Sequence, residues 1–328
     1  MNVSTSLPTG TVGTSYSGTI AVTGGSAPYT FTFATGSLPE GLSLNTTSGT
    51  ISGTPSSSGT SNFAIQVSDV AGASQKQSFQ ITVSNPPTPT APASSGKSFS
   101  SVQKSGGWNS FGQQYPRYVD CSPSPCEGIT FWMGQNISSP SMTGDAAGFS
   151  VGGTVPFSDA LFNNHLIGPG SSQGLPDSSH TLVPSLHNFT YDVYFYGGDL
   201  GASQALEFDI NQFFNNLGFI FGHECRIASG NEWDVWDNQN KKWVATGVPC
   251  YPNENSWNHV TLKVQRDSND NLVYQSITLN GQTSTLNWTF PPGTSPGWYG
   301  FTINYQMDGD AKQSPYTIYL DKLTVSYQ

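Results

Sequence analysis

Residues 206–211 alternate apolar and polar side chains, and the polar ones are Glu207, Asp209 and Asn211. Because successive side chains of a β-strand point to opposite faces, these three would line one face of a strand with an apolar row behind them. Carboxylates accept hydrogen bonds, and amides both donate and accept them. Gln212, the next residue, is a second amide. A face of this composition suits the binding of a hydroxylated ligand better than the transfer of a proton.

The same segment resembles the Glu-x-Asp-x-Glu and Glu-x-Asp-x-x-Glu strands of jelly-roll glycoside hydrolases of the laminarinase and lichenase type. The resemblance implies that Glu207 is the nucleophile and that Asp209 supports it. The last glutamate of that motif, the general acid/base, is replaced by Asn211 in a regular strand or by Gln212 in a bulged one. We therefore expect a carbohydrate-binding protein without catalysis. A weaker alternative is that both domains are structural or adhesive surface modules, in which case this polar sheet face has no ligand.

Hydrolysis is the main alternative, and it requires an acid from elsewhere in the chain. Glu224, Glu232 and Asp234 are the candidates.

A second polar segment, residues 230–237, places Trp236 on the same strand face as Glu232 and Asp234, whereas Trp233 points to the opposite face. A tryptophan beside carboxylates can stack on a sugar ring while the acids accept hydrogen bonds from its hydroxyls. Trp236 could instead pair with Trp243 across a hairpin. Trp132 could line the groove or belong to the core. The expected groove is lined by Glu207, Asp209, Asn211, Gln212, Trp132, Trp233, Asp234 and Trp236.

The composition is that of an all-β extracellular protein. Only 10% of the 328 residues are charged, 12% are aromatic, and glycine, proline and small polar residues are abundant. The net charge of −10 disfavours nucleic acid as a partner. No apolar run is long enough to cross a bilayer, and we expect no membrane insertion. We expect a monomer whose partner is a polysaccharide or an oligosaccharide.

The first 85 residues alternate short strand-like runs with glycine-rich turns, without any helical period. The ordered motifs Leu7-Pro8, Leu38-Pro39-x-Gly41-Leu42 and Gly49-x-Ile51-x-Gly53-Thr54-Pro55 resemble the Ig domains of bacterial surface and secreted proteins. The resemblance implies a small Ig-like β-sandwich and a bacterial source. Residues 86–98 begin with a Pro/Thr run, which predicts a semi-rigid linker.

Residues 99–328 predict a single large β-sandwich of about ten to fourteen strands. The segments 257–264, 277–281 and 316–325 resemble strands of concanavalin A-like lectin/glucanase domains. The resemblance implies a jelly-roll fold. The predicted fold class is therefore all-β, with an Ig-like sandwich at 1–85 followed by a jelly roll at 99–328.

Cysteines occur only in the second part of the chain, and their spacing does not match zinc ligation. Pairing of neighbours, Cys121–Cys126 and Cys225–Cys250, is the simplest of three connectivities. Disulfides would indicate an oxidising compartment. We expect a secreted or cell-surface protein whose signal peptide has been removed.

We expect no cofactor. Asp308 and Asp310 resemble an acidic calcium loop, which leaves a structural calcium ion as a weaker alternative.

Overall fold

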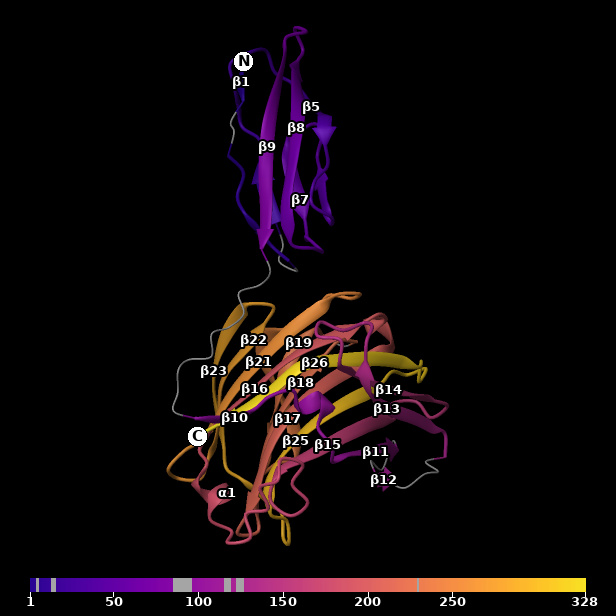
Figure 1. Cartoon of the computed structure of the whole chain (residues 1–328), viewed down its shortest axis with the longest axis vertical. Coiled ribbons are helices and arrows are strands. Elements are labelled where there is room, and N and C mark those ends of the chain that lie inside the picture. The colour runs from indigo at the N-terminus through magenta and orange to yellow at the C-terminus, as the bar shows by residue number, and fades with distance from the viewer. Residues whose placement is uncertain (4–5, 13–15, 85–95, 115–118, 122–126, 229) are drawn as a thin grey trace. The chain divides into compact units, whose positions relative to one another are not determined.

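The computed structural model describes residues 1–3, 6–12, 16–84, 96–114, 119–121, 127–228 and 230–328. The chain divides into two compact units, Met1–Ala93 and Ser94–Gln328. Figure 1 shows that each unit is built from strands. Strand β10, the first of the second unit, begins at Lys97.

The first unit contains three small sheets around one core. A four-stranded sheet has the order β2-β9-β8-β5, a three-stranded sheet the order β3-β7-β6, and β1 pairs with β4. Phe31, Ile65 and Ile81 lie in the core between the sheets. The predicted Ig-like sandwich is confirmed. The strands are β1 (Asn2–Val3), β2 (Gly10–Thr11), β3 (Tyr16–Thr19), β4 (Val22–Thr23), β5 (Tyr29–Gly36), β6 (Leu42–Leu44), β7 (Thr50–Gly53), β8 (Gly59–Asp69) and β9 (Ser74–Ser84).

The second unit contains two large antiparallel sheets. We call one the β26 sheet, with the order β13-β14-β26-β16-β21-β22-β23 and with β10 on β26. Its strands are β10 (Lys97–Phe99), β13 (Ile129–Ile137), β14 (Ala146–Gly153), β16 (Asn188–Gly197), β21 (Trp257–Arg266), β22 (Leu272–Leu279), β23 (Gln282–Phe290) and β26 (Tyr316–Tyr327).

We call the other the β17 sheet, with the order β12-β11-β15-β25-β17-β18-β19-β20 and with β24 on β18. Its strands are β11 (Trp108–Gln114), β12 (Val119–Cys121), β15 (Asp159–Ile167), β17 (Ser203–Phe214), β18 (Leu217–Arg226), β19 (Glu232–Asp237), β20 (Lys242–Pro249), β24 (Gly293–Thr294) and β25 (Gly300–Gly309). Three short helical turns are η1 (Val102–Lys104), α1 (Leu182–Ser185) and η2 (Leu200–Ala202).

The chain changes sheets at each step from β14 to β17, which gives the antiparallel jelly-roll connectivity. Alternating apolar residues of both sheets meet in one core, for example Phe149 and Leu320 from one sheet and Phe208 and Tyr305 from the other. Ring centroids of Phe208 and Tyr305 lie 5.4 Å apart. The predicted jelly-roll sandwich is confirmed, and each sheet keeps one outer face that points away from this core.

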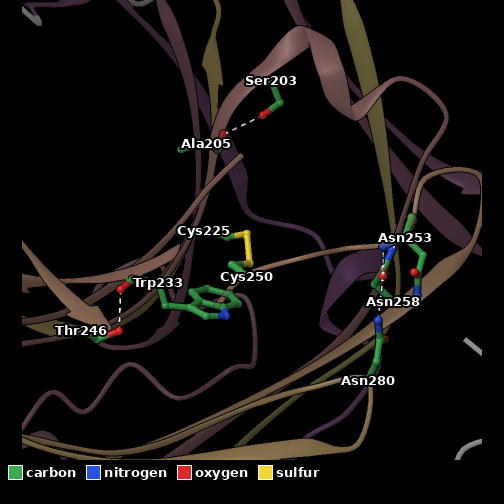
Figure 2. The surroundings of a disulfide bond; sticks show 9 residues. All are labelled: Ser203, Ala205, Cys225, Trp233, Thr246, Cys250, Asn253, Asn258 and Asn280. Carbon is green, nitrogen blue, oxygen red and sulfur yellow. Dashed lines mark hydrogen bonds between the residues drawn. A yellow bond between two sulfur atoms is a disulfide. The ribbon is translucent and has the colours of Figure 1, made fainter. Parts of the chain in front are cut away.

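A disulfide joins Cys225 of β18 to Cys250, which follows β20, with 5.7 Å between the Cα atoms. Figure 2 shows the buried Trp233 beside this bond. The prediction of Cys225–Cys250 is confirmed, whereas the predicted Cys121–Cys126 pair lies outside the residues whose side chains are described. None of the helices among the described residues has the length and hydropathy of a membrane span.

Candidate functional site

The outer face of the β17 sheet carries the predicted polar row. Leu206, Phe208 and Ile210 are completely buried in the core. The alternation along β17 therefore directs Glu207, Asp209 and Asn211 to the outer face. The pairing of β17 with β18 and β25 runs without a shift through these positions, so the strand is regular here and not bulged.

Neighbouring strands bring further carboxyl groups beside Glu207. Glu224 of β18 is the register partner of Glu207. Asp308 of β25 pairs with Ala205, which is the neighbour of Glu207 on the same face of β17. Asp159 of β15 is in turn the register partner of Asp308. We call Asp159, Glu207, Glu224 and Asp308 the carboxylate cluster. Each is exposed by less than a tenth of its surface.

Burial and mutual repulsion change the protonation of the cluster. Burial, followed by the charges of Asp308 and Asp234, raises the pKa of Glu224 to about 9, although Arg226 acts in the opposite direction. Burial and the neighbouring Asp308 also raise the pKa of Glu207 well above its ordinary value. The pKa of Asp308 rises less, to about 6, because Gln306 and Glu207 offset part of the burial effect by hydrogen bonding. At neutral pH the face thus holds protonated and ionised carboxyl groups side by side.

An amide holds two members of the cluster in place. Gln306 Nε2 donates to Glu207 Oε1 at 2.7 Å and to Asp308 Oδ1 at 2.9 Å. One side chain therefore aligns carboxyl groups from two adjacent strands, as positioning of a reactive or ligand-binding pair requires.

Three buried side-chain oxygens on this face lack a hydrogen-bond partner among the described residues. They are Oδ1 of Asp209, Oδ1 of Asn211 and Oδ1 of Asp234. The second oxygen of Asp209 accepts from Asn304 Nδ2 at 3.1 Å, and Oδ2 of Asp234 lies 2.8 Å from Arg226 Nε. Because unpaired buried acceptors cost free energy, such groups mark a place where a ligand with hydrogen-bond donors would be stabilised.

Two tryptophans border the row of acceptors. Trp236 of β19 and Trp243 of β20 are register partners, and their rings pack edge to face with centroids 5.2 Å apart. A Cβ on Gly222 would lie 3.0 Å from both tryptophans and 3.3 Å from Asp209 Oδ1. Trp236 therefore pairs with Trp243 across the hairpin and also lies beside the acids, so both alternatives considered for it are present in the structure.

Of the three acids considered as proton donors, only Glu224 is the register partner of Glu207. Glu232 and Asp234 both pair with Arg226, at 3.1 and 2.8 Å.

The structure corrects the prediction that Gln212 lines the site. The regular alternation of β17 turns Gln212 inward, where its Nε2 donates to the carbonyl of Leu186 at 3.1 Å. Its Oε1 accepts from Arg266 Nε at 3.0 Å. Gln212 therefore anchors the segment around α1 rather than contacting a ligand.

Two tryptophans assigned to the groove lie elsewhere. Trp233 is only 1% exposed and packs against Phe208 in the core, because it alternates with the outward residues of β19. Trp132 belongs to the other sheet and points to the outer face of that sheet, since Phe131 and Met133 on either side of it pack on the core. The alternation of residues 230–237 had already placed Trp233 opposite Trp236, so its assignment to the groove contradicted that pattern, whereas no local pattern shows to which sheet Trp132 belongs.

The acids of the expected calcium loop have different surroundings. Asp308 belongs to the carboxylate cluster. Asp310 instead accepts hydrogen bonds from the backbone amides of Lys312 and Ser314, which closes a turn. Within the described part of the chain, no three His, Cys, Asp or Glu side chains are grouped to hold a metal ion.

Asp159, Gln306 and Asn304 are site residues that sequence reasoning missed. Their strands lie far from β17 in the sequence, and the only available signal was the alternation of Asn304, Gln306 and Asp308 with apolar residues in β25.

Comparisons with known proteins found a family model and solved structures that are similar to this chain. The family model described as "Putative Ig domain" matches residues 1–84. Similar solved structures include carbohydrate-binding modules of the β-sandwich superfamily, with 13% identity, a TM-score of 0.32 and coverage of 98% of this chain and 95% of the other.

Two further solved structures are similar to this chain at a comparable level. Peanut lectin is 12% identical with a TM-score of 0.33 and coverage of 67% and 96%. The Bacillus licheniformis β-glucanase is 11% identical with a TM-score of 0.33 and coverage of 72% and 99%. No curated protein matches this chain. Likeness at this level carries no argument about the chemistry of the site.

Proposed function

We propose that the second unit binds a neutral polysaccharide on the outer face of the β17 sheet. The observation that carries this proposal is the set of buried, unpaired oxygens of Asp209, Asn211 and Asp234 beside Trp236. Sugar hydroxyls donate hydrogen bonds to such oxygens, and the C–H face of a pyranose packs on an indole ring. The carboxylate cluster would repel an acidic glycan, which favours a neutral one.

The setting of this site supports an extracellular role. The proposal places the protein outside a bacterial cell, because an Ig-like unit and a disulfide in the second unit are typical of secreted chains. The Ig-like unit would then serve as a spacer or adhesive module.

Isothermal titration against soluble β-glucans, xylans and mannans tests the binding. We expect Asp209→Ala and Trp236→Ala each to weaken binding of the recognised glycan by roughly tenfold or more, because each removes a hydrogen bond to a charged group or a stacking contact. Phe33→Ala is the control, since Phe33 is an aromatic residue of β5 in the first unit and is 46% exposed. Absence of binding across the panel would refute the proposal.

One observation favours hydrolysis as a second candidate function. The strand 207–212 contains no proton donor beyond its own acids, as expected, but Glu224 on the adjacent strand stands opposite Glu207. Cross-strand partners have Cβ atoms about 4.5–5.5 Å apart. Side chains at that Cβ spacing can bring their carboxyl groups to the separation of about 5–5.5 Å found in retaining glycosidases. Repulsion between the two groups lets the pair hold a proton on one carboxyl while the other ionises.

Release of reducing ends from the same glycans separates the two functions. If the face is catalytic, Glu207→Gln and Glu224→Gln should each abolish release and leave binding within about threefold of the parent protein. If the parent protein binds a glycan but releases no reducing ends, the site is a binding site alone.

A further inference from the structure

The outer face of the β26 sheet carries aromatic side chains that the site on the β17 sheet does not use. Trp132 of β13, Tyr319 of β26, Tyr196 of β16 and Trp257 of β21 alternate with core residues and point away from the core. We call these four residues the aromatic row. They come from strands that are adjacent in the sheet, with only β14 between β13 and β26.

The indole of Trp132 packs against the backbone of its own sheet at two glycines. A Cβ on Gly134 would stand 2.1 Å from Cζ2 of the indole, and one on Gly148 would stand 3.0 Å from Cζ3. Glycine in the middle of a strand costs about 0.5–1 kcal/mol relative to alanine. The strands nevertheless have glycine at these two positions, and the absence of a side chain there leaves the space that the indole occupies. One face of the ring is covered by the sheet, and Trp132 remains 49% exposed.

The row continues across the sheet from Trp132. The same Cβ on Gly148 would lie 3.3 Å from Cε1 of Tyr319, so the two rings meet over this glycine. Tyr319 and Tyr196 are register partners with centroids 6.4 Å apart, and Tyr196 and Trp257 are partners with centroids 5.7 Å apart. With strands about 4.8 Å apart, four intervals from β13 to β21 give a row about 19 Å long.

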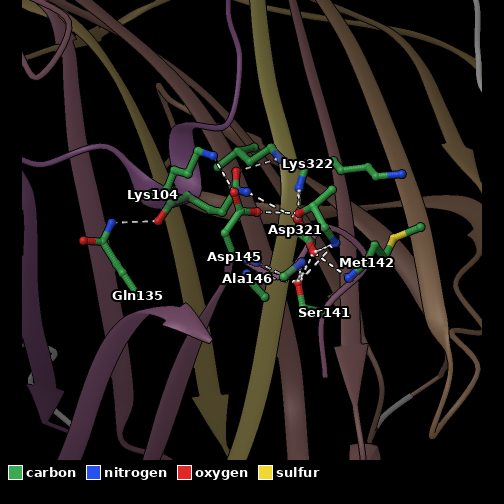
Figure 3. Close-up of polar contacts among 12 residues, drawn as sticks. Lys104, Gln135, Ser141, Met142, Asp145, Ala146, Asp321 and Lys322 are labelled. Carbon is green, nitrogen blue, oxygen red and sulfur yellow. Dashed lines mark hydrogen bonds and ion pairs between the residues drawn. The ribbon is translucent and has the colours of Figure 1, made fainter. Parts of the chain in front are cut away.

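Buried polar residues fix both ends of the row. Asp321, two residues after Tyr319, accepts from Ser141 Oγ at 2.8 Å and from the amide of Met142 at 2.7 Å, which fixes the connection between β13 and β14 (Figure 3). At the other end Asn258, next to Trp257, is hydrogen-bonded to Asn253 and Asn280 (Figure 2). The aromatic rings are thus carried by a rigid frame, which lowers the entropic cost of binding.

We propose that the aromatic row is a second glycan-binding surface, which takes a single extended, neutral polysaccharide chain. The face of each ring carries partial negative charge and attracts the C–H groups of a pyranose. Hydroxyl side chains beside the row, Ser150 and its register partner Thr317, match the hydroxyls of a sugar. None of the four row residues is charged, which favours a neutral ligand over an ionic one.

The ring angles indicate what form of glycan fits. The planes of Tyr319 and Tyr196 differ by 62°, and those of Tyr196 and Trp257 by 54°. A flat crystalline surface could not contact rings at such angles together, whereas a soluble chain can turn from one ring to the next. The surface is therefore suited to soluble chains. It uses a different sheet from the site of the proposed function and does not depend on that proposal.

The test uses the full chain and measures affinity for soluble neutral β-linked polysaccharides by titration and by retardation in polysaccharide-containing gels. Trp132→Ala should weaken binding at least fivefold, and Phe33→Ala in the first unit should leave it unchanged. Gly134→Ala should weaken it as well, because the added methyl group displaces the indole while Trp132 itself is retained. Far-ultraviolet circular dichroism and the unfolding midpoint verify that each variant folds.

The double variant Asp209→Ala, Trp236→Ala separates the two surfaces. Binding that survives in it and disappears when Trp132→Ala is added supports the aromatic row. Unchanged binding of Trp132→Ala in both backgrounds overturns the row, whatever the outcome at Asp209. Failure of every variant to bind any polysaccharide also overturns it. So does a change in sedimentation with Trp132→Ala but not in binding, which would assign the face to contact between copies of the chain.

Discussion

Glu207 on β17 and Glu224 on β18 are register partners in an antiparallel pair, with both side chains on the outer face of the sheet. Each is exposed by less than a tenth, and Asp308 lies near both, so neither can ionise at its ordinary pKa. The two carboxyl groups therefore form a coupled pair whose protonation can be followed through its effects on stability and on sugar chemistry.

The coupled pair of Glu207 and Glu224 should make the free energy of unfolding of the second unit fall as the pH rises. A carboxyl group whose pKa is higher in the folded chain than in the unfolded chain binds more protons when folded. Its stability contribution is complete below the unfolded pKa and is lost as the pH rises toward the folded value, for Glu224 between its ordinary pKa and about 9. We expect the free energy of unfolding to fall from pH 5 to pH 9, by at most about 1.4 kcal/mol per pH unit for each proton involved.

Urea unfolding at several pH values, monitored by tryptophan fluorescence, measures this pH dependence in the second unit, because all eight tryptophans lie there. Glu224→Gln, which cannot ionise, should reduce the slope and raise stability at pH 9 more than at pH 5. A slope that is unchanged in this variant would show that the pair is not the source.

Trp233 and Trp236, three residues apart, should respond to substitution in opposite ways. Trp233→Ala should lower the free energy of unfolding by about 3–5 kcal/mol, because it empties a site in the core beside Phe208. Trp236→Ala should cost less stability and should weaken glycan binding instead. Denaturant titration and calorimetric titration of the two variants test this, and equal stability losses would contradict the assignment of Trp236 to the outer face.

Removal of the disulfide should destabilise the second unit. Cys225 and Cys250 are separated by 25 residues, and the loop-entropy model gives roughly 3 kcal/mol for a crosslink of this length. The double variant Cys225→Ala, Cys250→Ala should unfold at correspondingly lower urea concentration than the oxidised parent. The parent protein under reducing conditions is the control and should approach the variant. A parent whose midpoint is insensitive to reductant would contradict the prediction.

Asp321 should contribute stability of the opposite pH dependence. Burial alone would raise the pKa of this carboxyl group, but hydrogen bonds from Thr143, Ser141 and two backbone amides outweigh it and hold the pKa below its ordinary value. The contribution is present above the unfolded pKa and is lost as the pH falls through the folded value.

Asp321→Ala should therefore cost about 1.5–3 kcal/mol at pH 7, because it removes the charged acceptor of several hydrogen bonds. The loss should shrink in acid. Urea unfolding at pH 7 and pH 3 measures it, with Asp321→Asn as the isosteric control. A loss that is equal at both pH values would count against the role of the ionised carboxylate.

The sequence by itself determined the class of fold and much of one strand. Period-two alternation in residues 204–211 requires that Glu207 and Asp209 share a face opposite Phe208, because alternation is a local property of the backbone. In the same way the strand-rich, turn-rich chain predicted two β-sandwiches, and the proximity of Cys225 and Cys250 in the sequence predicted their bond.

Only the tertiary structure decided which strands lie beside one another. The pairing of β17 with β18 and β25 sets Glu224 and Asp308 near Glu207, and the order of strands assigns Trp132 to the opposite sheet. Asp308 is about a hundred residues from Glu207 in the chain, so no local pattern connects them. Non-local register brings the carboxyl groups of neighbouring strands together and buries them among one another, which determined the protonation of the site. The order of strands in turn separated Trp132 and Trp236 onto different sheets.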